Sequence, residues 1–103
     1  YSTEALEELR SIYESTLQAV EMAIESYENR DVEKAKSVIE VESQIDKKQR
    51  KFRDLHIKRL YDGTCNAYAG AVFLDLLSNL ERIGDHANNI ATVKEIHENR
   101  LHA

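Results

Sequence analysis

Proline is absent from this 103-residue chain, and glycine occurs only three times, at Gly63, Gly70 and Gly84. This scarcity, together with abundant Glu, Lys, Leu, Ala and Arg, favours long helices over sheet. The length suffices for one modest hydrophobic core but not for a second independent one. We therefore expect a single all-α domain over residues 1–103.

Cysteine and long apolar runs are also scarce. The single cysteine, Cys65, cannot form an internal disulfide, so we interpret it as a loop residue of a reduced cytosolic protein rather than a catalytic thiol. The most apolar run, AGAVFLDLL, is short and contains Asp75, whereas a membrane-spanning helix needs ~20 apolar residues. We expect no segment of this chain to cross a bilayer. Because the chain opens at Tyr1 without methionine or a signal peptide, we expect it to be part of a larger protein.

The formal net charge of −5 is unevenly distributed. Residues 1–45 carry 4 basic and 11 acidic side chains, whereas residues 46–60 carry 7 basic and 2 acidic ones. A basic block can indicate nucleic acid or an anionic lipid surface. We interpret this one as a solvated helix face that balances two acidic helices, and we expect no nucleic-acid partner.

Apolar residues recur at three- and four-residue spacing along three segments, which is the pattern of helices packed along a seam. The segments are residues 3–29, 32–60 and 67–97. We expect Ser2 or Thr3 to cap the first helix, Asn29 to make the first turn and Asp31 to cap the second helix. Asp62 and Gly63 supply the second turn. The predicted seams are Leu6, Leu9, Tyr13, Thr16, Val20, Ala23 and Tyr27; Val38, Val41, Ile45, Phe52, Leu55 and Leu60; and Ala69, Phe73, Leu76, Leu80, Ile83, Ala87 and Ile90.

Short connections make successive helices antiparallel neighbours, so the predicted fold is an antiparallel, up-down-up three-helix bundle. Ile39, Ile57 and Leu77 lie off the predicted seams, where they would be exposed. Apolar residues outside the core make self-association plausible, and we expect a homodimer.

Two acidic motifs of the form E-x-x-x-D stand on different predicted helices. Glu42 and Asp46 form the first, and Glu81 and Asp85 form the second, with Asn89 one turn further on. Like charges four residues apart on a helix cost roughly 0.2–0.5 kcal/mol. Relative to the predicted seam, the second line of residues faces outward or along an edge of the bundle.

Carboxylate and amide oxygens are hard ligands that suit Mg, Mn, Ca or ferric iron better than a thiolate-seeking metal. The candidate metal ligands are therefore Glu42, Asp46, Glu81, Asp85 and Asn89. The alternative is that these acids are ordinary surface charges paired with Arg50, Arg53 or Arg82. Gly84, between the second pair, indicates close approach of another helix.

Catalytic patterns are lacking. His97, Glu98 and His102 form H-E-x-x-x-H, which is one residue too long for a zinc-protease motif, and we attribute it to chance. His56 and His86 are interpreted as packed or surface histidines, and no nucleophile has a partner. We expect no enzymatic activity and no small-molecule substrate.

The stretch LLSNLERIGDHANNIA resembles the signature of the PhoU family of phosphate-uptake regulators. Residues 52–91, FRDLHIKRLYDGTCNAYAGAVFLDLLSNLERIGDHANNIA, look like the PhoU-like tail domain of bacterial sodium/phosphate cotransporters. PhoU proteins are built from three-helix repeats, each with two E/D-x-x-x-D motifs that can carry metal ions or clusters. This chain matches that pattern at Glu42, Asp46, Glu81 and Asp85, with Asn89 at the family's following asparagine.

The resemblance implies a non-enzymatic regulatory domain on the cytoplasmic side of the cell membrane, attached to the transmembrane part of a phosphate transporter. It also implies a metal cofactor: iron, or Mg, Mn or Zn. A standard PhoU protein has two such repeats and this chain has one, so a homodimer could restore the missing half. The alternative function is a purely structural helical interaction module without metal; a metal-dependent hydrolase is the least supported hypothesis.

Overall fold

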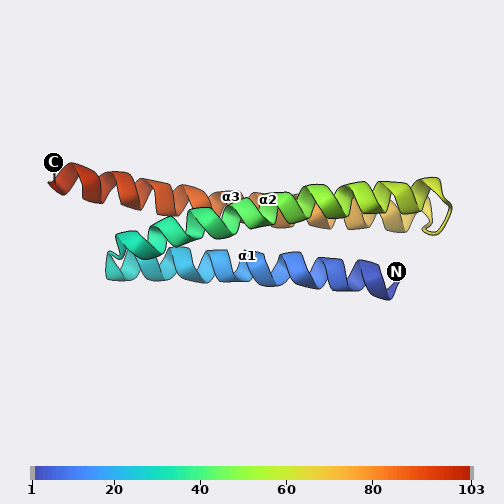
Figure 1. The fold of residues 1–103 in the computed structure, drawn as a ribbon, viewed down its shortest axis with the longest axis horizontal. Helices are drawn as coiled ribbons and strands as arrows, with labels where there is room; N and C mark the ends of the chain where they lie inside the picture. The colour runs from blue at the N-terminus through green and yellow to red at the C-terminus, as the bar shows by residue number, and fades with distance from the viewer. Residues whose placement is uncertain (1, 103) are drawn as a thin grey trace.

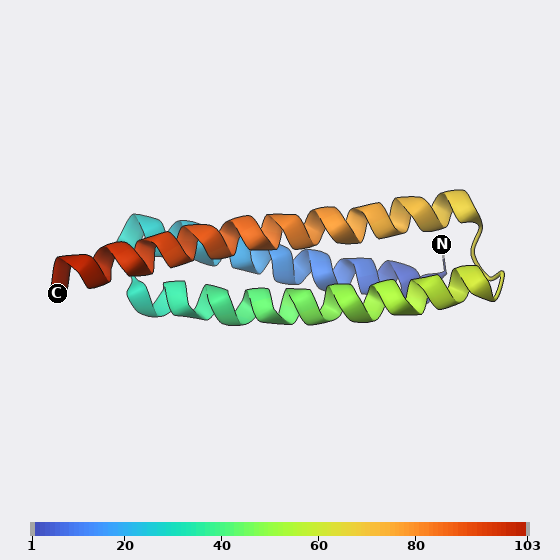
Figure 2. The ribbon, with the colours of Figure 1, turned by 90° about the horizontal axis from the view of Figure 1, so that it is seen from above.

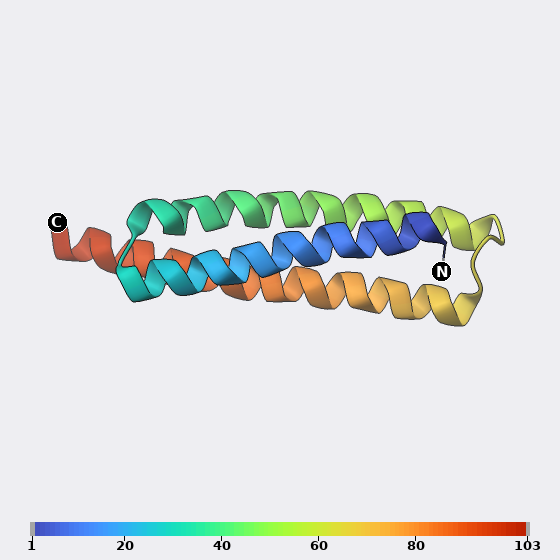
Figure 3. The same cartoon turned by 90° about the horizontal axis from the view of Figure 1, so that it is seen from below.

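The computed structural model describes the backbone of residues 2–102 and the side chains of residues 2–92. Three helices follow one another: α1 (Thr3–Asn29), α2 (Val32–Tyr61) and α3 (Ala67–His102). Each packs against the other two, so that they form a rod of 57 × 18 × 17 Å (Figure 1). α2 runs antiparallel to α1 and α3, as the views from above and below show (Figures 2 and 3). The predicted up-down-up three-helix bundle is confirmed.

Side-chain caps fix the beginnings of the first two helices. The Ser2 hydroxyl accepts a hydrogen bond from the backbone N–H of Ala5 at 3.1 Å, and the Asp31 carboxylate accepts one from the N–H of Lys34 at 3.0 Å. The turn between α1 and α2 was assigned to Asn29, which is wrong. Arg30 adopts the left-handed conformation instead, with φ 53°, and its N–H donates to the Ser26 carbonyl. Since Asn29 completes α1, the reversal falls one residue later.

The second connection is a tight turn, as predicted from Asp62 and Gly63. α2 extends one residue beyond the expected end, to Tyr61, and Gly63 takes a φ of 76°, which favours glycine. α3 was expected to end at 97 but continues to His102. No glycine or proline follows Gly84, so nothing in the sequence terminates the helix there. The side chains of His97, Glu98 and His102 lie outside the described residues.

Small side chains make up much of the core. Ala19, Ala23, Ala35, Ala87 and Ala91 are buried together with larger residues, of which the fully buried ones include Ile12, Ile45, Phe73 and Leu77. A thin rod brings helix axes close together, and alanine permits this approach. The core is therefore narrower than the bulky seams in the sequence imply.

The predicted seams were partly wrong. On α3, Leu76, Ile83 and Ile90 are exposed, and Leu77, expected off the seam, is fully buried. On α1, Leu6, Tyr13 and Tyr27 are exposed, as is Leu55 on α2. The seam prediction followed the largest apolar side chains, whereas the helices meet along lines that contain Ala and Gly. The prediction that Ile39 and Ile57 would be exposed is confirmed.

Gly84 lies where α2 and α3 approach each other. A Cβ atom at this position would stand 3.2 Å from Cδ1 of Ile45. This distance is tighter than ordinary van der Waals contact, so a larger side chain would push the helices apart. The prediction that Gly84 permits close helix packing is confirmed.

Among the residues that the structure describes, no helix combines the length and the hydropathy that a membrane span requires.

Enlarging Gly84 should separate α2 from α3. Gly84→Leu is expected to lower the free energy of unfolding by about 1–3 kcal/mol, because overpacking forces side chains and backbone to shift. Gly84→Ala should be nearly neutral, because the gain in helix propensity of about 1 kcal/mol is opposed by the tight contact with Ile45. Chemical denaturation measures both changes. Ala71→Leu, on the exposed side of the same helix, is the control, and an equal loss of stability in both leucine variants would contradict the role assigned to Gly84.

Candidate metal centre

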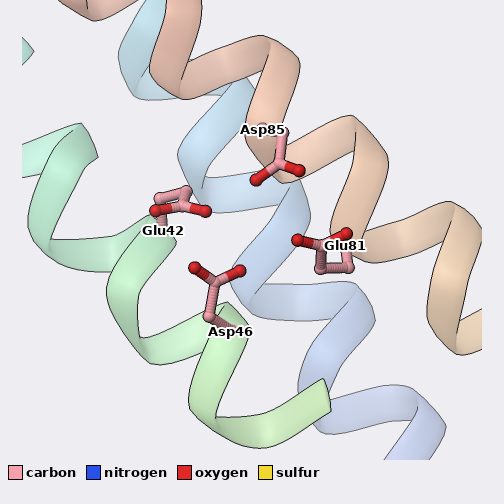
Figure 4. Close-up of side chains that lie close together, drawn as sticks. All are labelled: Glu42, Asp46, Glu81 and Asp85. Atoms are coloured by element: carbon pink, nitrogen blue, oxygen red, sulfur yellow. The ribbon is translucent and has the colours of Figure 1, made fainter. Parts of the chain in front are cut away.

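Four carboxylates from two helices converge at the groove between α2 and α3. Glu42 and Asp46 lie one turn apart on α2, and Glu81 and Asp85 lie one turn apart on α3 (Figure 4). One oxygen from each carboxylate can be chosen so that all four lie within 4.8 Å of one another. The structure thus brings together four of the five candidate ligands, which we call the carboxylate cluster.

The carboxylate cluster flanks the core. Glu42 is only 9% exposed, and the other three side chains are half-buried. Glu81 and Asp85 were predicted to face outward or along an edge of the bundle, and the structure places them along the edge that borders α2. They are more buried than the predicted seam implies, because the buried line of α3 passes through Leu77, Gly84 and Ala91, which lies nearer to the acids than the predicted line does.

The contact between Gly84 and Ile45 sets the spacing of the carboxylate cluster. Gly84 precedes Asp85, and Ile45 precedes Asp46, so the closest approach of α2 and α3 lies beside the acids. Because side chains one turn apart share a helix face, each helix presents its pair of acids to the same groove. The local pattern of each motif and the helix contact together produce the cluster.

No cation neutralises these acids among the described residues. The ion pairs there join Lys34 to Glu25, Lys36 to Glu33, Arg53 to Asp54, and Arg59 to Glu8. None includes a member of the carboxylate cluster. The alternative that Arg50, Arg53 or Arg82 pairs with these acids is therefore not supported.

Crowded carboxylates hold protons that isolated ones would lose. Burial, followed by the nearby Asp85 and Asp46, raises the pKa of Glu42 to about 8. Burial, followed by Asp85 and then Asp46, raises the pKa of Glu81 to about 7. A protonated carboxyl can donate a hydrogen bond to an ionised neighbour, which an ionised one cannot. Near neutral pH the cluster without metal is therefore held together in part by protons.

One polar atom of the carboxylate cluster lacks a partner in the described part of the chain unless a neighbouring acid is protonated. Oδ1 of Asp46 is buried and, without a proton on Glu42 or Glu81, accepts no hydrogen bond there. Oδ1 of Asn88 is likewise buried and accepts none. Leaving a buried acceptor unsatisfied costs about 1–3 kcal/mol. A cation bound by the cluster would give the Asp46 oxygen a partner, so the residues present fit a metal.

Asn88 was missed by the sequence analysis. It stands seven residues after Glu81 and three after Asp85, which places it on the same flank of α3. It is half-buried, whereas the predicted ligand Asn89 is exposed. The seven-residue spacing from Glu81 could have identified Asn88.

The donor set determines which ions the carboxylate cluster could hold. Four carboxylates provide only hard oxygen ligands, which suit Mg, Mn, Ca or ferric iron, while Zn sites more commonly include His or Cys. Glu42 and Asp46 would hold such an ion from α2, and Glu81 and Asp85 from α3. His86 is exposed and is not among these residues.

A second polar group lies near the C-terminal end of α2. His56 is buried and stacks on Phe73 with ring centroids 3.9 Å apart, which confirms that it is a packed histidine. Its Nδ1 lies 3.4 Å from Nη1 of Arg59, and its Nε2 lies 3.6 Å from Sγ of Cys65. Arg59 also donates to both oxygens of Glu8. This network joins α1 to α2 and is separate from the carboxylate cluster.

The network also fixes the state of His56. A guanidinium only donates hydrogen bonds, so Nδ1 must accept and the neutral ring carries its hydrogen on Nε2. Burial, together with the Arg59 charge, lowers the pKa of His56. We interpret the group as a structural contact with a neutral histidine.

Comparisons with known proteins identify a family. The PhoU domain matches residues 9–93, a range that includes the whole carboxylate cluster. The phosphate-specific transport system accessory protein PhoU homolog 1 of Thermotoga maritima is 33% identical over 87 residues, covering 84% of this chain and 38% of that protein. PhoU homologs from two strains of Xylella fastidiosa, Temecula1 and 9a5c, are each 37% identical over 84 residues, covering 81% of this chain and 35% of the relative. No solved structure matches the chain.

The chain spans little more than a third of the length of these relatives. The comparison therefore concerns one helical unit of proteins that are considerably longer.

The raised pKa values predict how the metal-free protein responds to pH. Glu42 and Glu81 bind protons more tightly when folded than when unfolded, so stability should fall as pH rises from about 4.5 to about 8. Thermal melts in a chelating buffer, compared at pH 7.5 and pH 8.5, measure the effect, because unfolded His56, whose ordinary pKa is 6.5, has lost most of its proton by pH 7.5. Glu42→Gln combined with Glu81→Gln should flatten the profile. A parent protein that melts at the same temperature across this range would contradict the protonation assigned to the cluster.

Proposed function

The chain belongs to the PhoU family, and from that premise we propose that it is a non-enzymatic regulatory domain of a sodium-dependent phosphate transporter. The family match carries this proposal: the relatives are named as accessory proteins of a phosphate-specific transport system. The likeness of residues 52–91 to the tail domain of sodium/phosphate cotransporters supports the choice of transporter. Under this proposal the domain lies on the cytoplasmic side of the membrane and contacts the transmembrane part of its parent protein.

The proposed role includes a metal. The carboxylate cluster supplies four hard oxygen ligands without a competing cation among the described residues, and the buried Asp46 oxygen lacks a partner there unless a neighbouring acid is protonated. These features support a divalent or ferric ion, bound by Glu42, Asp46, Glu81 and Asp85. When bound, the ion would bridge α2 and α3 and thus stabilise the bundle.

A structural module without metal is the second candidate. The exposed apolar side chains of α1 and α3 favour it, because they indicate a role in protein contacts. The two candidates differ in one measurable property, which is whether the carboxylate cluster holds an ion.

The transporter role is tested in the organism that carries the gene. Deleting residues 1–103 should change sodium-dependent uptake of radiolabelled phosphate, and replacing sodium by choline defines the background. A variant with the carboxylate cluster neutralised should alter uptake in the same direction if the metal takes part in regulation. Uptake that is identical in the deleted and the parent strains, at both low and high phosphate supply, would contradict the proposal.

Neutralising the carboxylate cluster separates the metal hypothesis from the structural one. Above about pH 8, where Glu42 and Glu81 of the metal-free parent have lost their protons, Glu42→Gln, Asp46→Asn, Glu81→Gln and Asp85→Asn together remove two repelling pairs of about 0.2–0.5 kcal/mol each. The metal-free variant should therefore gain up to roughly 1 kcal/mol, a rise of about 4–8 °C in melting temperature. Titration with Mn²⁺ should raise the melting temperature of the parent and leave the variant unchanged.

A matched control has the same change of charge elsewhere. Glu7, Glu14, Glu28 and Glu40 are exposed, so replacing all four by Gln should preserve the response to Mn²⁺. Elemental analysis after equilibrium dialysis identifies which ion the parent retains. A parent that binds none of Mg²⁺, Mn²⁺, Ca²⁺ or ferric iron, together with a neutralised variant that melts lower, would favour the module without metal.

A further inference from the structure

The side of the bundle formed by α1 and α3 carries more exposed apolar surface than an isolated rod requires. On α1 the exposed residues are Leu6, Tyr13, Leu17 and Ile24, and on α3 they are Val72, Leu76, Ile83 and Ile90. Each of these side chains is between 38% and 55% exposed. Together they present roughly 600 Å² of apolar surface, at the upper limit of about 300–600 Å² for the largest patch on a typical monomer. We call them the α1–α3 face.

Both stripes lie on the side turned away from α2. On α1, Glu8 and Ser15 contact α2 through Arg59 and Lys48, and the apolar stripe lies about 140–200° further around the helix. On α3, Glu81 and Asp85 face α2, and Ile83 lies about 160° from Asp85 and 200° from Glu81. Since α1 and α3 pack against each other, the two stripes flank one groove and form a continuous surface.

The two stripes also lie at the same height along the rod. Ala5 of α1 and Ala69 of α3 line one small cavity beside His56, which aligns the two parallel helices. The centre of the α1 stripe lies midway between Leu6 and Ile24, and the centre of the α3 stripe lies midway between Val72 and Ile90. Counted from the level of the cavity, the heights of the two centres along the rod differ by about two residues, or ~3 Å. A single twofold axis perpendicular to the helices could therefore pass through the centre of both stripes.

The geometry points to a second copy of this chain as the partner of the α1–α3 face, placed antiparallel by that twofold axis. Such an axis, crossing α1 near residue 15, places Leu6 opposite Ile24 of the other copy and Tyr13 opposite Leu17. It also brings the exposed Arg10 close to the exposed Glu21 at the edge of the face, so charges of opposite sign meet. A self-complementary surface of this kind is what a twofold interface requires.

Two further observations support a second three-helix unit as the partner: the area of the α1–α3 face and the length of the relatives. Roughly 600 Å² per partner lies below the ~800 Å² of a standard interface and at the low end of specific ones, which fits a dimer of moderate affinity. The Thermotoga relative is long enough to contain a second unit of this size, because the matched region is 38% of it. In this chain a second copy would supply the equivalent surface.

The oligomeric state is the first test. Sedimentation equilibrium of residues 1–103 at 5–200 µM, a range chosen for a dimer of about micromolar affinity, should show a dimer in the parent. Ile83→Glu places a charge within the α1–α3 face and should raise the dissociation constant at least tenfold. Ile57→Glu is the matched control, because Ile57 is 49% exposed on the outer side of α2 and Ile83 is 43% exposed. A monomer at the highest concentration, or equal weakening by both variants, would overturn the proposal.

Cross-linking tests the orientation of the two copies. Both test variants carry Cys65→Ser as background. Measured along the helix axis, Leu17→Cys places the two symmetry-related thiols about 6 Å apart, whereas Leu6→Cys places them about 27 Å apart. A short bismaleimide should therefore join two copies of the Leu17→Cys variant and leave the Leu6→Cys variant uncoupled. Circular dichroism confirms that both variants remain helical. Failure to couple the Leu17→Cys variant, or equal coupling of both, would overturn the antiparallel arrangement.

Discussion

The close contact of α2 and α3 at Gly84 governs the rest of the molecule. With no side chain at this position, Ile45 fills the space against the α3 backbone, and the two helices approach at the level of Asp46 and Asp85. Each pair of acids alone would be an ordinary feature of a charged helix. Their convergence depends on a helix separation that a side chain larger than alanine at position 84 would prevent.

The close approach of α2 and α3 holds four carboxylates together, so their mutual repulsion opposes folding and must be offset by the packing of the bundle. Four carboxylates share a space in which their oxygens lie within 4.8 Å, and no basic side chain among the described residues offsets them. The protein can lower the cost by retaining protons on Glu42 and Glu81 or by binding a cation. Both would occupy the same oxygens, so a proton and a cation compete. A site of this kind holds metal more tightly as pH rises toward the raised pKa values.

The sequence predicted those features of the fold and the candidate site that depend on local pattern. The three helices, the caps at Ser2 and Asp31, the turn at Gly63 and both acid pairs follow from residues close together in the chain. The rotation of α3 could not be read in this way, because burial depends on how near the neighbouring helices come. The large residues at Leu76, Ile83 and Ile90 outweighed Gly84 and Ala91 in the sequence pattern, and the acids were consequently placed outward or along an edge rather than beside the core. Asn88 was missed for the same reason.

The wrongly predicted seam of α3 has a physical explanation. A three-four spacing of large apolar side chains indicates a packing surface, and on α3 this pattern is real although the bundle core does not use it. The core is built from small residues, which allow the helices to approach and the acids to meet. The larger residues are left on the opposite flank of α3, so this helix carries two surfaces with different chemistry. One surface consists of oxygen ligands in the groove with α2, and the other is an apolar stripe beside α1. The composition that makes the core narrow thus also leaves an apolar surface exposed to a partner.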